Sequence, residues 1–261
     1  MIKKAFIVPD VHGRDFWREA KNAITDESID KIVFLGDYFD PYDDEEFLVT
    51  DDAMLAGFNE IIEFKKANPD KIVLLLGNHD IHYLYKNPYC SRHDDENEDR
   101  NCSLIKDNIE QFDLMYLDDI ECGDYTKVLF THAGLTSNFL KTFGRAGYPK
   151  DDLIELSNRV NADIKALKTH EYHTLSDLML RVSRFRGGDY ADGSILWADL
   201  REVVPNSFDF DDVYQIFGHT RGFFPTILKR YAMLDTRECY IADFYEGKIK
   251  NTYTGKEFSI T

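Results

Sequence analysis

The sequence has few cysteines, and none of them is spaced as in a zinc-binding motif. It contains 4 cysteines in 261 residues, and no pair shows the CxxC spacing typical of a zinc ribbon. Cys90 and Cys102 flank one polar segment and would be able to pair in an oxidising compartment. Reduced thiols are the favoured interpretation, and they indicate a cytoplasmic location.

Long apolar runs and an excess of basic side chains are also missing. No apolar stretch approaches the roughly 20 residues of a membrane-spanning helix, so no membrane partner is expected. The start, MIKKAFIVPDVHG, predicts a first strand rather than a signal peptide. Lys and Arg number 31 against 48 Asp and Glu, for a formal net charge of -17, which argues against nucleic acid as the main partner. A phosphorylated substrate remains compatible, because bound cations supply local positive charge.

The composition is that of an ordinary globular protein, with 43% apolar and 30% charged residues. No internal repeat, low-complexity segment or linker interrupts the chain, so residues 1–261 are predicted to form one domain. The oligomeric state is left open.

Strand-like and helical patterns alternate along the chain. Helical periodicity is clearest in EEFLVTDDAMLAGFNEIIEFKKA, and residues 151–184 are predicted to form a helical cap or insertion. Its apolar side is expected to carry Leu153, Ile154, Leu156, Val160, Ile164 and Leu167. The C-terminal runs YAMLDT, CYIADFY and KIKNTYT predict an antiparallel meander that closes a second sheet. The alternation indicates an α/β protein, with strands in IKKAFIVP, KIVFLG, KIVLLLG, KVLFT and VYQIFG.

A short polar signature follows each of these five strands: PDVHG, GDYFD, GNHD, THAG and FGHT. Ligand-binding groups gather at strand ends in layered α/β folds. Asp10 and His12 are two residues apart, so an extended backbone would put both on one face. Because Asp, Asn and His supply oxygen and nitrogen ligands, the pattern predicts a shared metal site. Its candidate ligands are Asp10, His12, Asp37, Asn78, His132 and His219.

The series D-x-H-G, G-D-x-x-D, G-N-H-D, H-A-G and G-H-T resembles the calcineurin-like metallophosphoesterase superfamily. Within it, the sequence is most similar to the branch of serine/threonine phosphoprotein phosphatases and bacterial diadenosine tetraphosphate hydrolases. SILWADL is similar to that branch's LLWSDP segment. The resemblance spans Asp10 to Thr220. It implies a four-layer α/β/β/α sandwich of two mixed sheets flanked by helices, with the site on loops at one edge.

The resemblance also implies roles for these residues. Asp10, His12 and Asp37 would hold one ion, and Asp37 would bridge to a second ion held by Asn78, His132 and His219. The ions would be Mn, Fe or Zn, about 4 Å apart and sharing a hydroxide that attacks phosphorus. His79 would be the general acid. Asp40 would hydrogen-bond it, fixing its tautomer and favouring the protonated ring.

The sequence departs from the branch at one position. The branch places a phosphate-binding Arg after GDYVD, whereas this chain has Pro41, then Tyr42 and an acidic run. Arg14 and Arg201 are nearby basic residues that follow other motifs. The substrate-binding residues predicted to compensate are Arg184, Arg186 and Arg221, since the first two flank a Gly-rich RFRGG turn and the third follows FGHT.

The remaining histidines are expected to have structural or surface positions and not to bind metal. His82 is expected to face a helix, and His93 to be solvent-exposed in an acidic loop over residues 91–100. His170 and His173 are expected at the end of a surface helix.

Hydrolysis of phosphate monoesters, including a phosphorylated small molecule or a phosphoprotein, is the leading interpretation. Hydrolysis of a dinucleoside polyphosphate such as diadenosine tetraphosphate is the first alternative, mildly supported by the H-A-G motif. A nucleic-acid phosphodiesterase is the third possibility, because the net negative charge of the chain disfavours binding to a phosphate backbone. A non-catalytic metal-binding scaffold is disfavoured, because all six ligands and the His79/Asp40 pair are present.

Overall fold

The computed structural model describes residues 1–42, 49–85, 89, 91–168, 174–204 and 210–260. Cys90, His170, His173 and the acidic run after Tyr42 lie outside the described residues. The described cysteines Cys102, Cys122 and Cys239 are free thiols.

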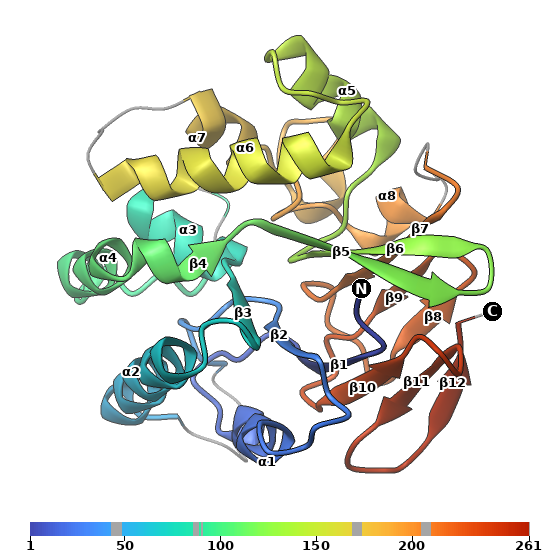
Figure 1. The fold of residues 1–261 in the computed structure, drawn as a ribbon. Helices are drawn as coiled ribbons and strands as arrows, with labels where there is room; N and C mark the ends of the chain where they lie inside the picture. Colours follow the sequence, from blue (N-terminus) through green and yellow to red (C-terminus); the bar gives the residue numbers. More distant parts are fainter. Residues whose placement is uncertain (43–48, 86–88, 90, 169–173, 205–209, 261) are drawn as a thin grey trace.

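Seven strands form the first sheet, in the order β12-β11-β10-β1-β2-β3-β4 (Figure 1). Strands β1 to β4 run parallel, with Phe6 opposite Ile32 and Val33 opposite Val73. Strands β10 to β12 add antiparallel partners on the other side of β1. The strands are β1 (Lys4–Val8), β2 (Lys31–Phe34), β3 (Ile72–Leu75), β4 (Phe112–Asp113), β10 (Tyr240–Asp243), β11 (Lys248–Asn251) and β12 (Glu257–Ser259).

Five strands form the second sheet, in the order β5-β6-β7-β9-β8. It is also mixed, because β6, β7 and β9 are parallel while β5 and β8 pair antiparallel at the edges. The strands are β5 (Met115–Cys122), β6 (Tyr125–Thr131), β7 (Val213–Phe217), β8 (Thr226–Leu228) and β9 (Tyr231–Met233).

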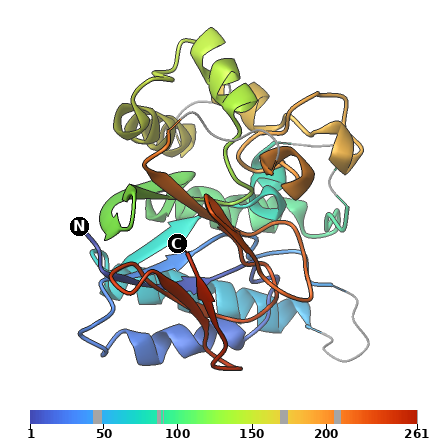
Figure 2. The same cartoon turned by 90° about the vertical axis from the view of Figure 1, so that its right-hand side faces the viewer.

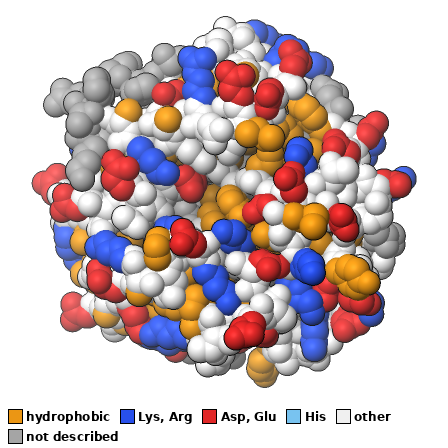
Figure 3. Space-filling model, in the orientation of Figure 1, with side chains coloured by type: hydrophobic (Ala, Val, Ile, Leu, Met, Phe, Trp, Pro, Cys, Tyr) orange, Lys and Arg blue, Asp and Glu red, His pale blue; other side chains and the backbone are white. Residues whose placement is uncertain are grey.

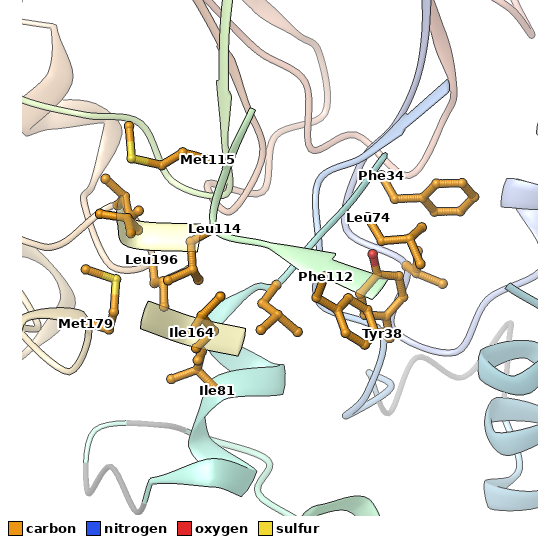
Figure 4. Close-up of a cluster of buried hydrophobic side chains, with 14 of the residues drawn as sticks. Phe34, Tyr38, Leu74, Ile81, Phe112, Leu114, Met115, Ile164, Met179 and Leu196 are labelled. Atoms are coloured by element: carbon orange, nitrogen blue, oxygen red, sulfur yellow. The ribbon is translucent and has the colours of Figure 1, made fainter. Parts of the chain in front are cut away.

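Strands β1, β2 and β3 are buried on both faces, which explains their uninterrupted hydrophobic runs. Side chains alternate along β1: Ala5 and Ile7 face the second sheet, whereas Phe6 and Val8 pack toward helices. Figure 4 shows part of the larger core, where Phe34, Leu74 and Phe112 lie around Tyr38. Buried apolar clusters between the two sheets, and between the sheets and the helices, therefore hold the layers together.

Helices cover the outer faces of the two sheets (Figures 1 and 2). Helix α2 packs on β3, and α6 packs on β4 and β5. This arrangement confirms the predicted α/β fold of two mixed sheets flanked by helices. The helices are η1 (Phe16–Glu19), α1 (Ala20–Ala23), α2 (Asp51–Ala67), α3 (Asn78–Leu84), α4 (Glu98–Asp107), η2 (Ile109–Gln111), α5 (Ser137–Arg145), α6 (Leu153–Lys165), η3 (Ala166–Lys168), α7 (Thr174–Met179), η4 (Arg184–Arg186) and α8 (Leu200–Val203).

Two local expectations are wrong. The C-terminal meander does not close the second sheet: β10, β11 and β12 extend the first sheet beside β1, and only β9 joins the second. Within residues 151–184, Ile154 is 53% exposed, while Leu153, Leu156, Val160 and Ile164 are buried. The apolar, buried face of α6 is narrower than the sequence pattern predicts. Ile154 follows Leu153 directly, so its side chain points about 100° away from that of Leu153 around the helix axis.

The surface carries charges of both signs. Acidic and basic side chains are interspersed over the face seen in Figure 3, without a continuous basic stripe of the kind that tracks a nucleic-acid backbone. Within the described residues, no helix is both long and apolar enough to cross a membrane.

Candidate metal centre and active site

The loops after β1 and β2 bring the first ligand group together. One donor atom each from Asp10, His12 and Asp37 lies within 4.8 Å of the others, and all three side chains are buried. His12 Nδ1 donates to the carbonyl oxygen of Phe39 at 2.8 Å, which leaves its Nε2 lone pair 3.4 Å from Asp37 Oδ2. His12 has a φ of +45°, so the two side chains converge through a turn and not, as expected, along an extended backbone.

The second ligand group lies on the other side of Asp37. His132 Nδ1 donates to the carbonyl oxygen of Leu35 at 2.8 Å, so its Nε2 carries a lone pair. That atom is 2.9 Å from Asn78 Oδ1, 3.1 Å from His219 Nδ1 and 3.5 Å from Asp37 Oδ1. Two hydrogen-bond acceptors such as Nε2 and Oδ1 repel each other at this distance unless a cation lies between them. The donor set therefore fits a divalent metal.

The electrostatics of the buried groups lead to the same conclusion. Burial raises the pKa of Asp10 and Asp37 well above the usual range. It also lowers the pKa of His12 and His219 well below the usual value and that of His132 to about 3. Neutral imidazoles are the form that binds metals, and buried carboxylates this close need positive charge beside them.

The backbone around these ligands adopts sparsely populated conformations. Asp37, Asp40 and His219 have φ values of +55°, +55° and +64°. Such strain persists where the surrounding structure imposes it, and it concentrates at functional sites. Backbone N–H groups hold the carboxylates in place: His219 donates to both oxygens of Asp10 at 3.0 and 3.1 Å, and His79 donates to Asp37 Oδ1 at 2.8 Å.

Asp80 orients the loops that carry the ligands, a role that the sequence interpretation missed. Its carboxylate accepts N–H groups of Gly77 at 2.7 Å, Asp37 at 2.9 Å and Tyr38 at 2.8 Å. Burial raises its pKa to about 7. The sequence does carry one indication of this role: Asp80 is the third residue of a helix, a position where a carboxylate often accepts hydrogen bonds from free backbone N–H groups.

Gly77 and Gly218 pack directly against the ligand carboxylates. A Cβ atom at Gly218 would overlap Asp10 Oδ1, and one at Gly77 would overlap Asp37 Oδ1. We expect Gly218→Ala to displace Asp10 and to weaken metal binding about 10- to 100-fold, as loss of ligand orientation does. Calorimetric titration of the metal-stripped protein with Mn²⁺ measures this affinity.

Gly57→Ala is the matched control for that substitution. The added Cβ would lie 3.9 Å from Trp17 Nε1, an ordinary contact inside α2. It should leave metal affinity unchanged and stabilise the helix by about 0.5–1 kcal/mol. Wild-type metal affinity in the Gly218 variant would contradict the tight packing around Asp10.

The proposed acid pair, His79 and Asp40, lies beside the ligand groups. His79 Nδ1 is 2.7 Å from Asp40 Oδ2, and the same oxygen is 2.7 Å from His82 Nε2. Burial would raise the pKa of Asp40, but hydrogen bonds from the two histidines outweigh it and lower the pKa to about 2. Burial lowers the pKa of His79 to about 4 despite the opposing effect of Asp40. Asp40 does favour the protonated ring, but burial has the larger effect on the pKa of His79.

Arg92 contacts this pair, and sequence reasoning did not find it. Its Nη2 lies 3.1 Å from His79 Nε2, and its Nη1 donates to the carbonyl oxygen of Asp40. His93, expected to be exposed, is only 18% exposed because its ring stacks on Tyr83. The segment predicted as an acidic loop thus folds back onto the site. Nothing in the spacing of residues in SRHDDENEDR predicts that this segment packs against His79 and Asp40.

The predicted substrate-binding arginines occupy different places. Arg186 Nη2 donates to Thr220 Oγ1 at 2.7 Å, and its Nε lies 2.9 Å from Asp199 Oδ2, so it is anchored next to His219. The Arg221 guanidinium lies 4.7 Å from the ring centroid of Tyr42. Arg184 is exposed on η4, and within the described part of the chain no contact joins it to the ligand groups.

The sequence matches the family model of calcineurin-like phosphoesterases over residues 4–221. The chain belongs to the calcineurin-like phosphoesterase family. The matched range contains both ligand groups, His79 and Asp40. This family member is a metal-dependent phosphoesterase, and hence a hydrolase.

The phosphoesterase is also similar to a solved structure of a protein serine/threonine phosphatase from Saccharomyces cerevisiae with similarity to human phosphatase PP5. The two share 13% sequence identity, the alignment covers 92% of this chain and 72% of that chain, and the TM-score is 0.47. Among curated proteins, none matches the sequence significantly.

Proposed function

We propose that this phosphoesterase hydrolyses phosphate monoesters with two metal ions held on either side of Asp37. Asp10, His12 and Asp37 would hold one ion, and Asp37, Asn78, His132 and His219 would hold the other. The main support is that metal-binding nitrogen and oxygen atoms gather on both sides of the Asp37 carboxylate. His79 lies beside them. When bound, the ions lower the pKa of water and neutralise charge on phosphoryl oxygens.

The chain's own residues supply orientation and a proton. Hydrogen bonds to the carbonyl oxygens of Phe39 and Leu35 fix the tautomers of His12 and His132, so that both direct Nε2 toward the centre. In its protonated form, which the Asp40 carboxylate favours, His79 donates the proton of Nε2 to the leaving oxygen, while its Nδ1–H stays hydrogen-bonded to Asp40. The leaving alcohol is thereby released neutral.

Removal and restoration of metal tests this function. We expect chelation followed by desalting to abolish hydrolysis of p-nitrophenyl phosphate, and added Mn²⁺, Fe²⁺ or Zn²⁺ to restore it. The same assay with diadenosine tetraphosphate and a phosphopeptide separates the alternatives. Full activity in the stripped protein, shown by elemental analysis to hold no metal, would overturn the proposal, and dominant turnover of the dinucleotide would replace monoesters as the substrate.

A further inference from the structure

One short helix carries three side chains that contact the carboxylate of Asp40. Helix α3 has His79 near its start, and His82 and Tyr83 follow three and four positions later. Residues at these spacings lie on the same face of a helix, so both side chains lie beside His79. All three are buried, and so is Asp40. The proposed acid therefore shares its carboxylate partner with two neighbours on the same helix.

Both oxygen atoms of the Asp40 carboxylate are engaged from this helix. Oδ2 lies 2.7 Å from His79 Nδ1 and 2.7 Å from His82 Nε2. Oδ1 accepts a hydrogen bond from the Tyr83 hydroxyl. Burial alone would raise the pKa of Asp40, but its contacts with the two histidines lower the pKa to about 2, so the group is an ionised acceptor. A carboxylate held through both oxygens cannot rotate without losing one of these contacts.

The His82 ring has no other hydrogen-bond partner within the described residues. The hydrogen bond from its Nε2 to Asp40 is bent, and its Nδ1 is buried without a partner. Its other contacts are with the edges or faces of rings, at centroid distances of 5.4 Å to His79, 4.4 Å to Tyr83 and 4.6 Å to His93. Asp40 is therefore the polar group through which His82 acts on the site.

Asp40 is also held through its backbone. Its φ of +55° lies in the left-handed region, a conformation that persists where the surrounding structure imposes it. Its carbonyl oxygen accepts a hydrogen bond from Arg92 Nη1, and Arg92 Nη2 lies 3.1 Å from His79 Nε2. The main chain and the carboxylate of Asp40 are thus both fixed, which leaves the His79 ring little freedom to turn.

We propose that His82, together with Tyr83, is a positioning residue for the general acid. The two side chains fix the Asp40 carboxylate, and Asp40 in turn aims His79 Nε2 at the leaving oxygen. The proposal rests on the proposed phosphoesterase function and on the acid role of His79. Misplacement of a reacting group by about 1 Å costs about 10²-fold in rate. Because the side chains of His82 and Tyr83 contact Asp40 and neighbouring rings, their substitution should leave metal binding intact.

The test compares phenyl phosphate with p-nitrophenyl phosphate in the Mn²⁺-loaded protein. Nitrophenolate departs readily as an anion, whereas phenolate needs the proton of His79. In His82→Leu we expect the ratio of kcat for phenyl phosphate to kcat for p-nitrophenyl phosphate to fall about 10- to 100-fold. Both KM values and the metal content should stay at their wild-type values. The ratio is measured within one protein, so a partly unfolded sample does not change it.

Two conservative variants and a control accompany this change. His82→Gln keeps an N–H donor in place of Nε2 and should restore most of the ratio. Tyr83→Phe removes only the hydroxyl that donates to Asp40 Oδ1, and it should lower the ratio in the same direction. Tyr148→Phe is the matched control, because the buried Tyr148 donates its hydroxyl to Asp163 Oδ2 at 2.6 Å, away from the site. It should keep the wild-type ratio.

A double-mutant cycle shows whether His82 acts through His79. Once His79 is replaced by alanine, adding His82→Leu should change the ratio no further, because there is no acid left to position. A merely structural His82 would lower the melting temperature of its variants and leave the ratio at the wild-type value, which would overturn the proposal. A further loss in the His79→Ala background would also overturn it. Wild-type protein that fails to hydrolyse p-nitrophenyl phosphate with Mn²⁺ would instead overturn the phosphoesterase function itself.

Discussion

Asp37→Asn is expected to leave the protein folded and unable to hold either metal ion tightly. Asp37 is the one residue shared by both ligand groups, with Oδ2 toward His12 and Oδ1 toward His132. The amide keeps the shape of the side chain but removes the charge that offsets two neighbouring cations. We expect elemental analysis after dialysis to show less than one ion per chain, and hydrolysis of p-nitrophenyl phosphate to fall about 10³-fold or more, beyond the loss of a single electrostatic contact.

Asp119→Asn provides the control for this change. Asp119 pairs with Lys127 on the surface, at 2.5 Å, and its side chain is 63% exposed. An exposed pair contributes about 1 kcal/mol at most, so metal content and activity should match the wild type. If the Asp37 variant retains two tightly held ions, the bridging role is wrong.

His79→Ala is expected to separate catalysis from metal binding. His79 lies beside the ligand groups, and its ring contacts Asp40 and Arg92. Metal content should therefore be unchanged. Removal of a general acid costs about 10²- to 10⁴-fold when the leaving group is a poor one. A leaving group that departs readily as an anion needs no proton.

A series of aryl phosphates measures this effect within one protein. Turnover of phenyl phosphate should fall by about 10²- to 10⁴-fold, whereas turnover of p-nitrophenyl phosphate should fall far less. A logarithmic plot of rate against leaving-group pKa should become steeper in the variant. An equal loss for every substrate would indicate that His79 acts on binding or on the metals and not as the acid.

The strands were predictable because they depend on local sequence. The convergence of the polar signatures was predictable because each signature directly follows a strand. Apolar runs such as KIVLLLG form strands buried on both faces, and parallel strands end at the same edge of the sheet, which brings Asp10, Asp37 and Asn78 together. The polar residues after each strand therefore identified the candidate site without knowledge of the strand order.

Other features depend on long-range packing and were not predictable in this way. The C-terminal strands pair with β1 rather than with the second sheet, and nothing in their own sequence selects between the two edges. Arg92 lies 13 residues after His79, and the contact between them depends on tertiary packing rather than on a local pattern. Likewise, Arg14 and Arg237 lie far apart in sequence and meet only at Tyr42.

Crystals of the Mn²⁺-loaded protein, with anomalous diffraction recorded on both sides of the manganese absorption edge, test whether two ions flank the Asp37 carboxylate. Two anomalous peaks are expected, one on each side of the Asp37 carboxylate: the first next to His12, and the second next to His132 and His219. A single peak, or fully loaded crystals with no peak within bonding distance of Asp37, would contradict it.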